Sequence, residues 1–563
     1  MAENSAASLN RAALLQLGLL IAASVAALFL LMVLLNWAAS ATGSDASAAK
    51  AVDLEARSIS VIVQNEPPQL NSMKATDTDS GQVLGHIMEG LLRYDINNQL
   101  APGVAERWDI RENGATFWLR EDAKWSDGEP VTAHDFVFAW RTALDPATAS
   151  IYAFILYPVK NGEAINRGEA APETLGVRAA SDRRLEIEFE QPVAYFDKLV
   201  AFNVYYPVRE DFYRSTNGRY GADADEMLYN GAFVLSEWVH NASMRFEKNP
   251  HYWDRDSIYL NSIHVPFITN SKHTAVNLFK DGRVAMAELD AETLPDALQQ
   301  QWHIKRFVDG SVFYLEFNHR PGRVSTNLNF RRAIEMALDP KELVFRVIKV
   351  PGYLPGETLF PIWLMGEKTL FRQEYPPAQR IYNPERAREH LEQARVELGL
   401  NAWPPLVLLS GDTPISVKQS EHIQAKLREN LGLDMRLDRQ IFKQRLEKMK
   451  NGEFDIVMAG WGPDFDDPMT FGDLFASWNL QNRGRYNNPK LDAQVRIAQA
   501  SLEPAVRMRA FGEIQRILKE DAVILPDYER GKVFVQDPRM IDMARRAVGP
   551  DPDYSRVRLV DAN

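Results

Sequence analysis

The sequence predicts an α/β protein of two lobes that follows an N-terminal transmembrane helix. Three observations support this fold class. The chain has 563 residues, which is too many for one hydrophobic core. Stretches with helical and with strand-like patterns alternate through its second half, which favours an α/β lobe. One long apolar stretch lies near the N-terminus and no second one follows, so the chain is not itself a channel or permease.

The apolar stretch covers residues 12–39. Residues 13–35 alone supply the roughly 20 residues that a helix needs to cross a bilayer, whereas a secretory signal has an apolar core of roughly 7–15. We therefore expect an uncleaved membrane anchor. Small residues such as Ala39 and Ser40 leave cleavage open as an alternative.

The charges that flank this stretch predict its orientation. Arg11 precedes it, and the first charge after it is Asp45. The positive-inside rule then places residues 1–11 in the cytoplasm and the rest of the chain on the periplasmic or extracellular face of the cytoplasmic membrane. Residues 40–57 begin with an Ala/Ser/Gly-rich run and are predicted to form a flexible tether.

Composition excludes several classes of function. The net charge is −12 and no basic run occurs, so a nucleic-acid partner is not expected. The absence of cysteine excludes disulfides, thiol catalysis, Cys-ligated zinc and lipid attachment through an N-terminal cysteine. We expect the part of the chain outside the membrane to be monomeric.

The motifs of common enzymes and metal sites are not found. The chain contains no Gly-x-Ser-x-Gly elbow, no P-loop and no Gly-x-Gly-x-x-Gly cradle. His240 and His251 are the closest local histidine grouping, and we interpret them as structural or surface residues. The acidic run that starts at Asp464 lacks the Gly and the terminal Glu of a calcium loop. We predict no cofactor and no catalysis, although a carboxylate pair of a peptidase or glycosidase remains an open alternative.

Periodicity predicts the main elements outside the membrane. Thr132 and Asp135 have the spacing of a capping box and are expected to open a helix. Strands are expected at 58–63, 116–119, 184–189, 312–317, 405–409, 434–437 and 455–459, and further helices at 83–92, 330–338, 384–398 and 416–431.

A series of short motifs then follows in a fixed order. They are Glu66-Pro67-Pro68-Gln69-Leu70-Asn71, Glu89-Gly90-Leu91-Leu92, Pro102-Gly103-Val104-Ala105-Glu106-Arg107-Trp108, Phe117-Trp118-Leu119-Arg120, Trp125-Ser126-Asp127-Gly128, Pro130-Val131-Thr132-Ala133-His134-Asp135-Phe136, Asn230-Gly231-Ala232-Phe233, Asn249-Pro250-His251-Tyr252-Trp253, Phe330-Arg331-Arg332-Ala333 and Phe454-Asp455-Ile456-Val457-Met458-Ala459-Gly460-Trp461. Each is weakly specific alone. As an ordered set they resemble the solute-binding proteins of peptide and nickel ABC transporters (solute-binding family 5), closest to the oligopeptide-binding receptors. The resemblance extends from about residue 58 to the C-terminus.

The resemblance implies a periplasmic-binding-protein-like fold of the large cluster C type, with three subdomains. Two lobes joined by two hinge strands would close over a ligand. The implied parts are a first lobe at 58–315 plus 528–563 with an inserted subdomain at about 93–216, a second lobe at 316–527, and hinge crossings near 314–317 and 526–528.

The resemblance also implies ligand-binding residues. Gly460, Trp461 and Gly462 match the segment whose backbone pairs with a peptide as an added strand. Asp464 matches the carboxylate that meets the ligand's α-amino group, as a buried ammonium requires. Its alternative role is a turn or cap residue. Candidates for the rest of the wall are Trp461 and Phe442, each with plain core packing as the alternative, then Ser80 and Gln82 in the first lobe, and further Tyr152 and Phe154.

The carboxylate end of the implied site departs from the family pattern. Met449 and Met458 stand where oligopeptide receptors place arginines, and Ser416 stands in place of a histidine. Arg346 replaces a lysine and is retained as a candidate anion partner. Longer peptides with a solvent-exposed C-terminus and amine-rich non-peptide ligands both fit this pattern, and a nickel or haem-like cargo is a further alternative within the family.

We therefore predict the extracytoplasmic solute-binding component of an ABC transporter, which binds peptides, in particular oligopeptides, in the cleft between its lobes for uptake. Its expected partners are a peptide, an ABC permease and, through the N-terminal helix, the membrane. The alternative is a membrane-anchored peptide or metabolite sensor or scaffold without a dedicated permease.

Overall fold

The computed structural model describes residues 50–561, and the residues from Ala51 onward belong to one compact unit. Within the described residues, none of the helices has both the length and the apolar character required to span a bilayer. The predicted anchor at 12–39 and most of the tether lie outside the described residues.

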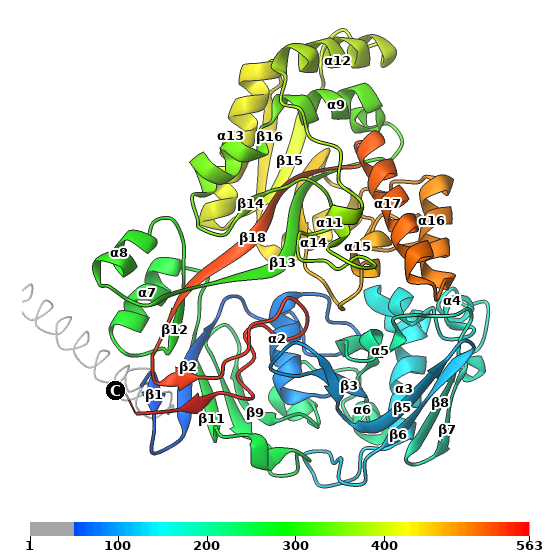
Figure 1. The fold of residues 1–563 in the computed structure, drawn as a ribbon, viewed down its shortest axis with the longest axis vertical. Helices are drawn as coiled ribbons and strands as arrows, with labels where there is room; N and C mark the ends of the chain where they lie inside the picture. The colour runs from blue at the N-terminus through cyan, green and yellow to red at the C-terminus, as the bar shows by residue number, and fades with distance from the viewer. Residues whose placement is uncertain (1–49, 562–563) are drawn as a thin grey trace, which may run out of the picture. The chain divides into compact units, whose positions relative to one another are not determined.

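The chain forms two lobes of α/β character (Figure 1). One lobe contains two sheets, and its five-stranded sheet includes the first strands of the described chain. The five-stranded sheet has the order β1 (Val52–Asp53), β2 (Ser58–Val63), β11 (Ser262–Ile268), β10 (Ser243–Lys248) and β9 (Phe233–Val239), and the four-stranded sheet has the order β5 (Ala105–Arg111), β6 (Gly114–Leu119), β8 (Arg184–Glu188) and β7 (Val177–Ser181).

A seven-stranded mixed sheet forms the second lobe and extends into the first. Its strands are, in order, β12 (Met286–Leu289), β18 (Ile524–Gln536), β13 (Ile304–Phe317), β17 (Ile456–Trp461), β15 (Leu406–Gly411) and β16 (Met435–Gln440), with β14 (Leu354–Pro355) beside β18. Two short hairpins complete the strands, β3 (Leu92–Tyr94) with β4 (Leu100–Pro102) and β19 (Met540–Ile541) with β20 (Arg558–Leu559).

Two long strands connect the lobes. β13 and β18 have 14 and 13 residues and pair with each other along most of their length. The antiparallel register breaks between Val308 and Val312, so the ladder is interrupted midway. Beyond the break the rings of Phe313 and Tyr528 stack, with centroids 4.8 Å apart. Figure 1 shows the pair passing from one lobe to the other. The predicted hinge crossings lie on these strands, and the residue boundaries of the lobes stay a prediction.

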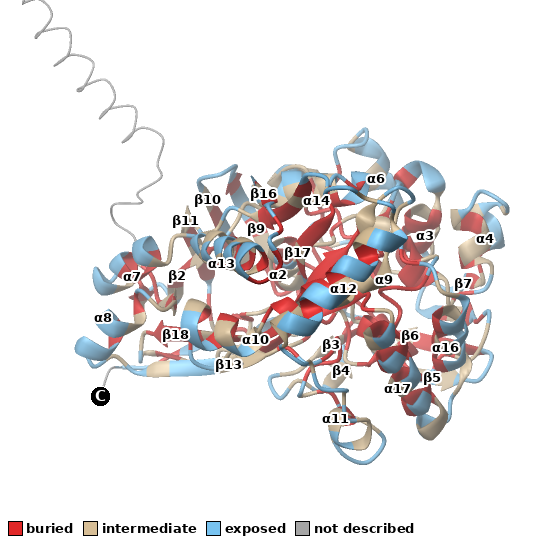
Figure 2. Cartoon of the chain, turned by 90° about the horizontal axis from the view of Figure 1, so that it is seen from above, coloured by how far each residue is buried: buried red, intermediate tan, exposed pale blue. Residues whose placement is uncertain are grey.

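The core of the second lobe follows from its amphipathic helices. In helix α12 (Pro384–Glu397) the buried residues Ala387, Leu391 and Ala394 recur every three to four positions, as one helix face requires. The face turned to solvent is visible in Figure 2. These side chains pack with helices α9 (Leu328–Ala337) and α13 (Pro414–Leu431) against β15, β16 and β17. The predicted alternation of strands and helices is confirmed here.

The capping box predicted from Thr132 is also confirmed. Helix α3 (Ala133–Leu144) begins there, and the Thr132 backbone N–H donates to Asp135 Oδ2 (2.8 Å). The indole of Trp125 donates to the same carboxylate oxygen (3.1 Å), so the cap also anchors the preceding turn.

One helix lies earlier than predicted. The helix expected at 83–92 is α2 (Thr78–Ile87). It begins earlier because Asp77 caps it, accepting from the Ser80 backbone N–H at 2.8 Å. It ends earlier because the backbone N–H of Glu89 donates to the side-chain oxygen Oδ1 of Asn230 (3.0 Å) and not to a carbonyl of the helix.

The remaining helices vary in length, and the longest of them, α17, buries one face in the core. They are α4 (Gly162–Asn166), α5 (Phe196–Leu199), α6 (Glu210–Ser215), α7 (Lys272–Lys280), α8 (Leu294–Gln299), α10 (Pro340–Glu342), a π-helix (Leu343–Ile348), α11 (Phe371–Glu374), α14 (Phe442–Asn451), α15 (Met469–Gly472), α16 (Pro489–Ala500) and α17 (Pro504–Glu520).

Candidate functional site

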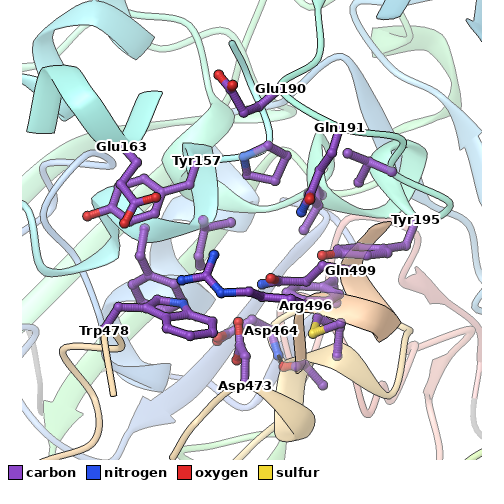
Figure 3. A pocket seen from close by; sticks show the side chains of 18 of the residues that line it. Tyr157, Glu163, Glu190, Gln191, Tyr195, Asp464, Asp473, Trp478, Arg496 and Gln499 are labelled. Atoms are coloured by element: carbon purple, nitrogen blue, oxygen red, sulfur yellow. Dashed lines mark hydrogen bonds between the residues drawn. The ribbon is translucent and has the colours of Figure 1, made fainter. Parts of the chain in front are cut away.

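A cavity of about 120 Å³ lies where the two lobes meet. Residues between 154 and 199 line it from the first lobe, and residues between 461 and 499 line it from the second (Figure 3). The first-lobe wall includes the 3₁₀ segment Ile151–Leu156 and α5. The second-lobe wall starts at the end of β17 and includes α15 and α16.

Asp464 lies in the loop after β17 and lines this cavity. Tyr152 donates its hydroxyl to Asp464 Oδ1 at 3.1 Å across the interface between the lobes. Asp464 forms no ion pair with any residue in 50–561. Burial raises the pKa of the Asp464 carboxyl well above its usual range, and the nearby charge of Asp473 raises this pKa further. The carboxylate is therefore enclosed without a protein cation.

Trp461 stands beside this carboxylate. Its ring meets that of Tyr152 edge to face, with centroids 6.5 Å apart. The indole N–H is buried and finds no acceptor among the described residues. A buried donor without a partner costs free energy until an acceptor arrives. The strand end thus offers an indole donor without an acceptor next to a carboxyl group without a cation partner.

The backbone of β17 is open on one edge near the cavity. β13 pairs with it as far as Val312↔Trp461. On the other side, the ladder to β15 ends at Leu409↔Val457. Within the described chain, residues 458–461 therefore have a strand neighbour on one side. A free edge of this kind can accept an added strand.

Steric constraints explain why glycine occupies positions 460 and 462 of this segment. A Cβ on Gly460 would lie 2.6 Å from Phe313 Cδ1, and one on Gly462 would lie 3.2 Å from Ser311 Oγ. The first contact is too close for any side chain. Gly460 therefore lets β17 pack directly on the hinge strand.

The loop that carries Asp464 also holds the lobes together. Phe465 stacks on Tyr195 of the first lobe, with centroids 5.6 Å apart and planes 10° apart. The Asp466 backbone N–H donates to the Tyr94 hydroxyl at 3.4 Å. We refer to residues 464–466 as the closing loop. Its base is fixed by a buried bidentate ion pair in which Arg507 bonds Asp467 at 2.6 and 2.9 Å.

The other predicted residues lie outside the cavity wall. Ser80 is fully buried and donates its hydroxyl to Asp77 Oδ2 (2.7 Å), so it completes the α2 cap. Gln82 is half-buried and its carbonyl accepts from the His86 ring. Arg346 is exposed on the π-helix.

Phe442 marks a second, basic region of the same lobe. It is half-buried at the start of α14, and the guanidinium of Arg445 lies 5.6 Å from its ring. Arg445 Nη1 donates to the Met458 carbonyl at 3.1 Å, and its Nε is buried without an acceptor among the described residues.

Arg483 completes this region. It contacts Met449 Sδ at 3.6 Å through Nη1 and donates to Gln481 Oε1 at 2.7 Å. Burial lowers the pKa of the Arg483 and Arg445 guanidinium groups, and neither forms an ion pair within residues 50–561.

Reasoning from the sequence missed both arginines. They lie against Met449 and Met458, the two positions where the expected arginines are missing. Arg483 stands in an irregular segment, so no periodic pattern singles it out. Its one local signal was its place between Asn482 and Gly484 in a turn.

Comparison with known proteins defines the family. Residues 99–482 match the model of the bacterial extracellular solute-binding proteins, family 5 Middle. The chain belongs to this family. Among the family's relatives, the dipeptide-binding protein DppE of Bacillus subtilis is 30% identical over 502 residues, covering 89% of this chain and 91% of that protein.

Solved structures of the family share the fold. The peptide-bound OppA of Listeria monocytogenes is 32% identical, with a TM-score of 0.84 over 90% of this chain and 99% of that one. The murein tripeptide binding protein MppA of Escherichia coli, 26% identical, matches with a TM-score of 0.81 over 90% and 99%. Its unliganded open form, covering 92% and 99%, reaches 0.64. The lobes of this protein are therefore arranged differently from that open form, in agreement with the contacts of the closing loop.

Proposed function

We propose that this protein binds peptides between its lobes and delivers them to an ABC permease for uptake. The proposal extends to this chain the cargo named for DppE and OppA. The observation that carries it is Asp464, an enclosed carboxylate without a protein cation, beside the open edge of β17. A peptide supplies both missing partners, since it has an α-ammonium group and a backbone that can pair as a strand.

The ligand's other end would face the arginine region. The guanidinium groups of Arg445 and Arg483 form no ion pair within the described residues, and they flank the β17 segment on which the peptide would lie. A C-terminal carboxylate or backbone carbonyls would satisfy them. In this proposal the wall of the peptide site is completed by Gly460, Trp461, Gly462 and Phe442. The other predicted ligand-binding residues, Ser80, Gln82 and Arg346, lie outside this wall and would act on the ligand indirectly, through neighbouring residues.

The proposal includes a membrane-bound receptor. Residues 12–39 would anchor the chain and leave both lobes on the outer side of the cytoplasmic membrane, within reach of a permease. The proposed lobe limits are those predicted from the sequence, 58–315 plus 528–563 and 316–527.

Native mass spectrometry of the full-length chain in mild detergent, followed by denaturing release, tests the function. We expect co-purified peptides of mixed sequence whose binding raises the melting temperature of the protein. A single non-peptide species would keep the fold and replace the cargo. If no ligand is retained and no peptide raises the melting temperature, the peptide proposal is wrong and a sensor or scaffold role gains support.

A further inference from the structure

A second buried carboxylate lines the same cavity as Asp464. Asp473 follows α15 and is 8% exposed. The Asn479 side-chain amide donates to its backbone carbonyl (3.0 Å) and to Oδ1 (3.3 Å). Asp473 forms no ion pair with a described residue. Figure 3 shows the two carboxylates near each other on one side of the pocket.

The remaining charged groups of the cavity wall leave an excess of negative charge. Glu163 and Glu190 line it from the first lobe, and Glu163 is paired with Arg167 at 2.5 Å. Arg496 is the one basic residue among the described lining residues. Its guanidinium lies 4.3 Å from the ring of Trp478 and joins neither aspartate in an ion pair. Neither buried aspartate therefore has a cationic partner in an ion pair among the described residues.

The size of the cavity suits a side chain. Its volume is about 120 Å³, below the roughly 300–1,000 Å³ of pockets that enclose a whole drug-sized ligand. Tyr195, Phe465 and Met469 supply apolar surface along it. A flexible aliphatic stem with a charged tip buries its methylene groups on such surface and keeps its charge at the polar end.

We infer that this cavity is a subsite for a basic side chain on the first residue of the peptide, so that Asp464 takes the α-ammonium and Asp473 the side-chain cation. The inference rests on the proposed function and adds a substrate class to it, peptides that begin with lysine, ornithine or arginine. Two enclosed carboxylates close together are costly when both are ionised, and a ligand with two positive charges removes that cost. The amide of Asn479 fixes the orientation of Asp473 but supplies no charge.

Three peptide libraries test the inference on the full-length chain. Each contains tri- to hexapeptides of mixed sequence with a fixed first residue, which is lysine, norleucine or Nε-acetyl-lysine. The three side chains share an aliphatic stem, and lysine alone carries a charge. Bound peptides are released and quantified by mass spectrometry. We expect the lysine library to be enriched about tenfold or more over the other two, the effect of a charge-assisted contact.

Asp473→Asn should abolish this enrichment and keep the binding of norleucine-first peptides, whereas the control variant Asp256→Asn, at an exposed carboxylate that does not line the cavity, should retain the enrichment. Equal enrichment of all three libraries on the unaltered chain would overturn the inference and leave peptide binding intact. Retention of no library would overturn the proposed function, and the inference with it. The comparison of libraries needs no variant, so a folding defect of Asp473→Asn does not prevent a decision.

Discussion

Two regions along strand β17 carry opposite charges. Within the described residues, the charged groups of neither region form an ion pair. Beyond the end of the strand, Asp464 and Asp473 are carboxylates without cations. Along its earlier part, Arg445 and Arg483 are buried guanidinium groups that form no ion pair with a described residue. Without a ligand, keeping these buried groups charged costs free energy because they form no ion pair. In the proposed function, the amino end of the peptide lies at the closing loop and its acceptor groups lie near the arginines.

The largest expected effect on affinity comes from a substitution in the acidic region. Asp464→Asn should lower the affinity for tri-alanine about 30-fold or more, because removing one partner of a buried charge pair costs about 2 kcal/mol or more. Isothermal titration calorimetry measures the change. Asp256→Asn, at an exposed carboxylate that does not line the cavity, is the control and should bind as the unaltered protein does. Unchanged affinity in Asp464→Asn, or equal binding of N-acetylated tri-alanine by the unaltered protein, would contradict the assigned ammonium contact.

The next effect concerns the basic side. Arg483→Gln should lower the affinity for a free C-terminal carboxylate about tenfold, since hydrogen bonds to charged groups contribute about 1.5–3 kcal/mol. The loss should be small for the matching C-terminal amide. The exposed Arg436 provides the control substitution Arg436→Gln. If the unaltered protein binds acid and amide equally, the arginines do not contact the carboxylate.

A third prediction uses the pH dependence of stability. Burial raises the pKa of Asp473 to about 7 from a usual value of 3.8. The folded state therefore holds this proton more tightly than the unfolded state, and the associated stability is lost as the pH rises from about 4 towards 7. The loss is at most about 1.4 kcal/mol per pH unit. Urea unfolding of the unliganded protein at pH 5 and pH 7 should show a steeper loss than in Asp473→Asn, and parallel losses would refute the assignment.

The smallest effect concerns the closing loop. Tyr195→Leu removes the ring that stacks on Phe465. Aromatic pairs contribute about 0.5–1.5 kcal/mol, so the balance between open and closed lobes should shift a few-fold towards the open form. Small-angle scattering of the unliganded protein would detect a larger radius of gyration. Tyr213→Leu, whose ring packs on Phe138 within the first lobe, should leave the radius unchanged.

The sequence predicted much of this fold because its cues are local. The helix face of α12 and the capping box at Thr132 depend on residues within a few positions of one another. The predicted C-terminal limit of α2 differs from the observed one because the end of this helix depends on Asn230, which is far away in the sequence.

The site divides in the same way. Asp464 and Trp461 belong to one contiguous motif, and the structure brings both to the cavity. Arg483 and Asp473 gain their roles from the tertiary fold, since Met449 and Asn479 are contacts that no spacing rule supplies. Arg346 is the opposite case. It was predicted from its matching position in the sequence, and the structure places it exposed on a π-helix.

The paired strands β13 and β18 have a consequence for how an occupied receptor is recognised. They are the two long strands that pass between the lobes, and hinge motion at such connecting strands would move one lobe against the other as a rigid body. The outer surface of the shut form is then the same for every cargo, because the cargo lies inside. A permease that touches both lobes would thus detect whether a peptide is present and remain blind to its sequence, so that broad uptake needs a single docking surface.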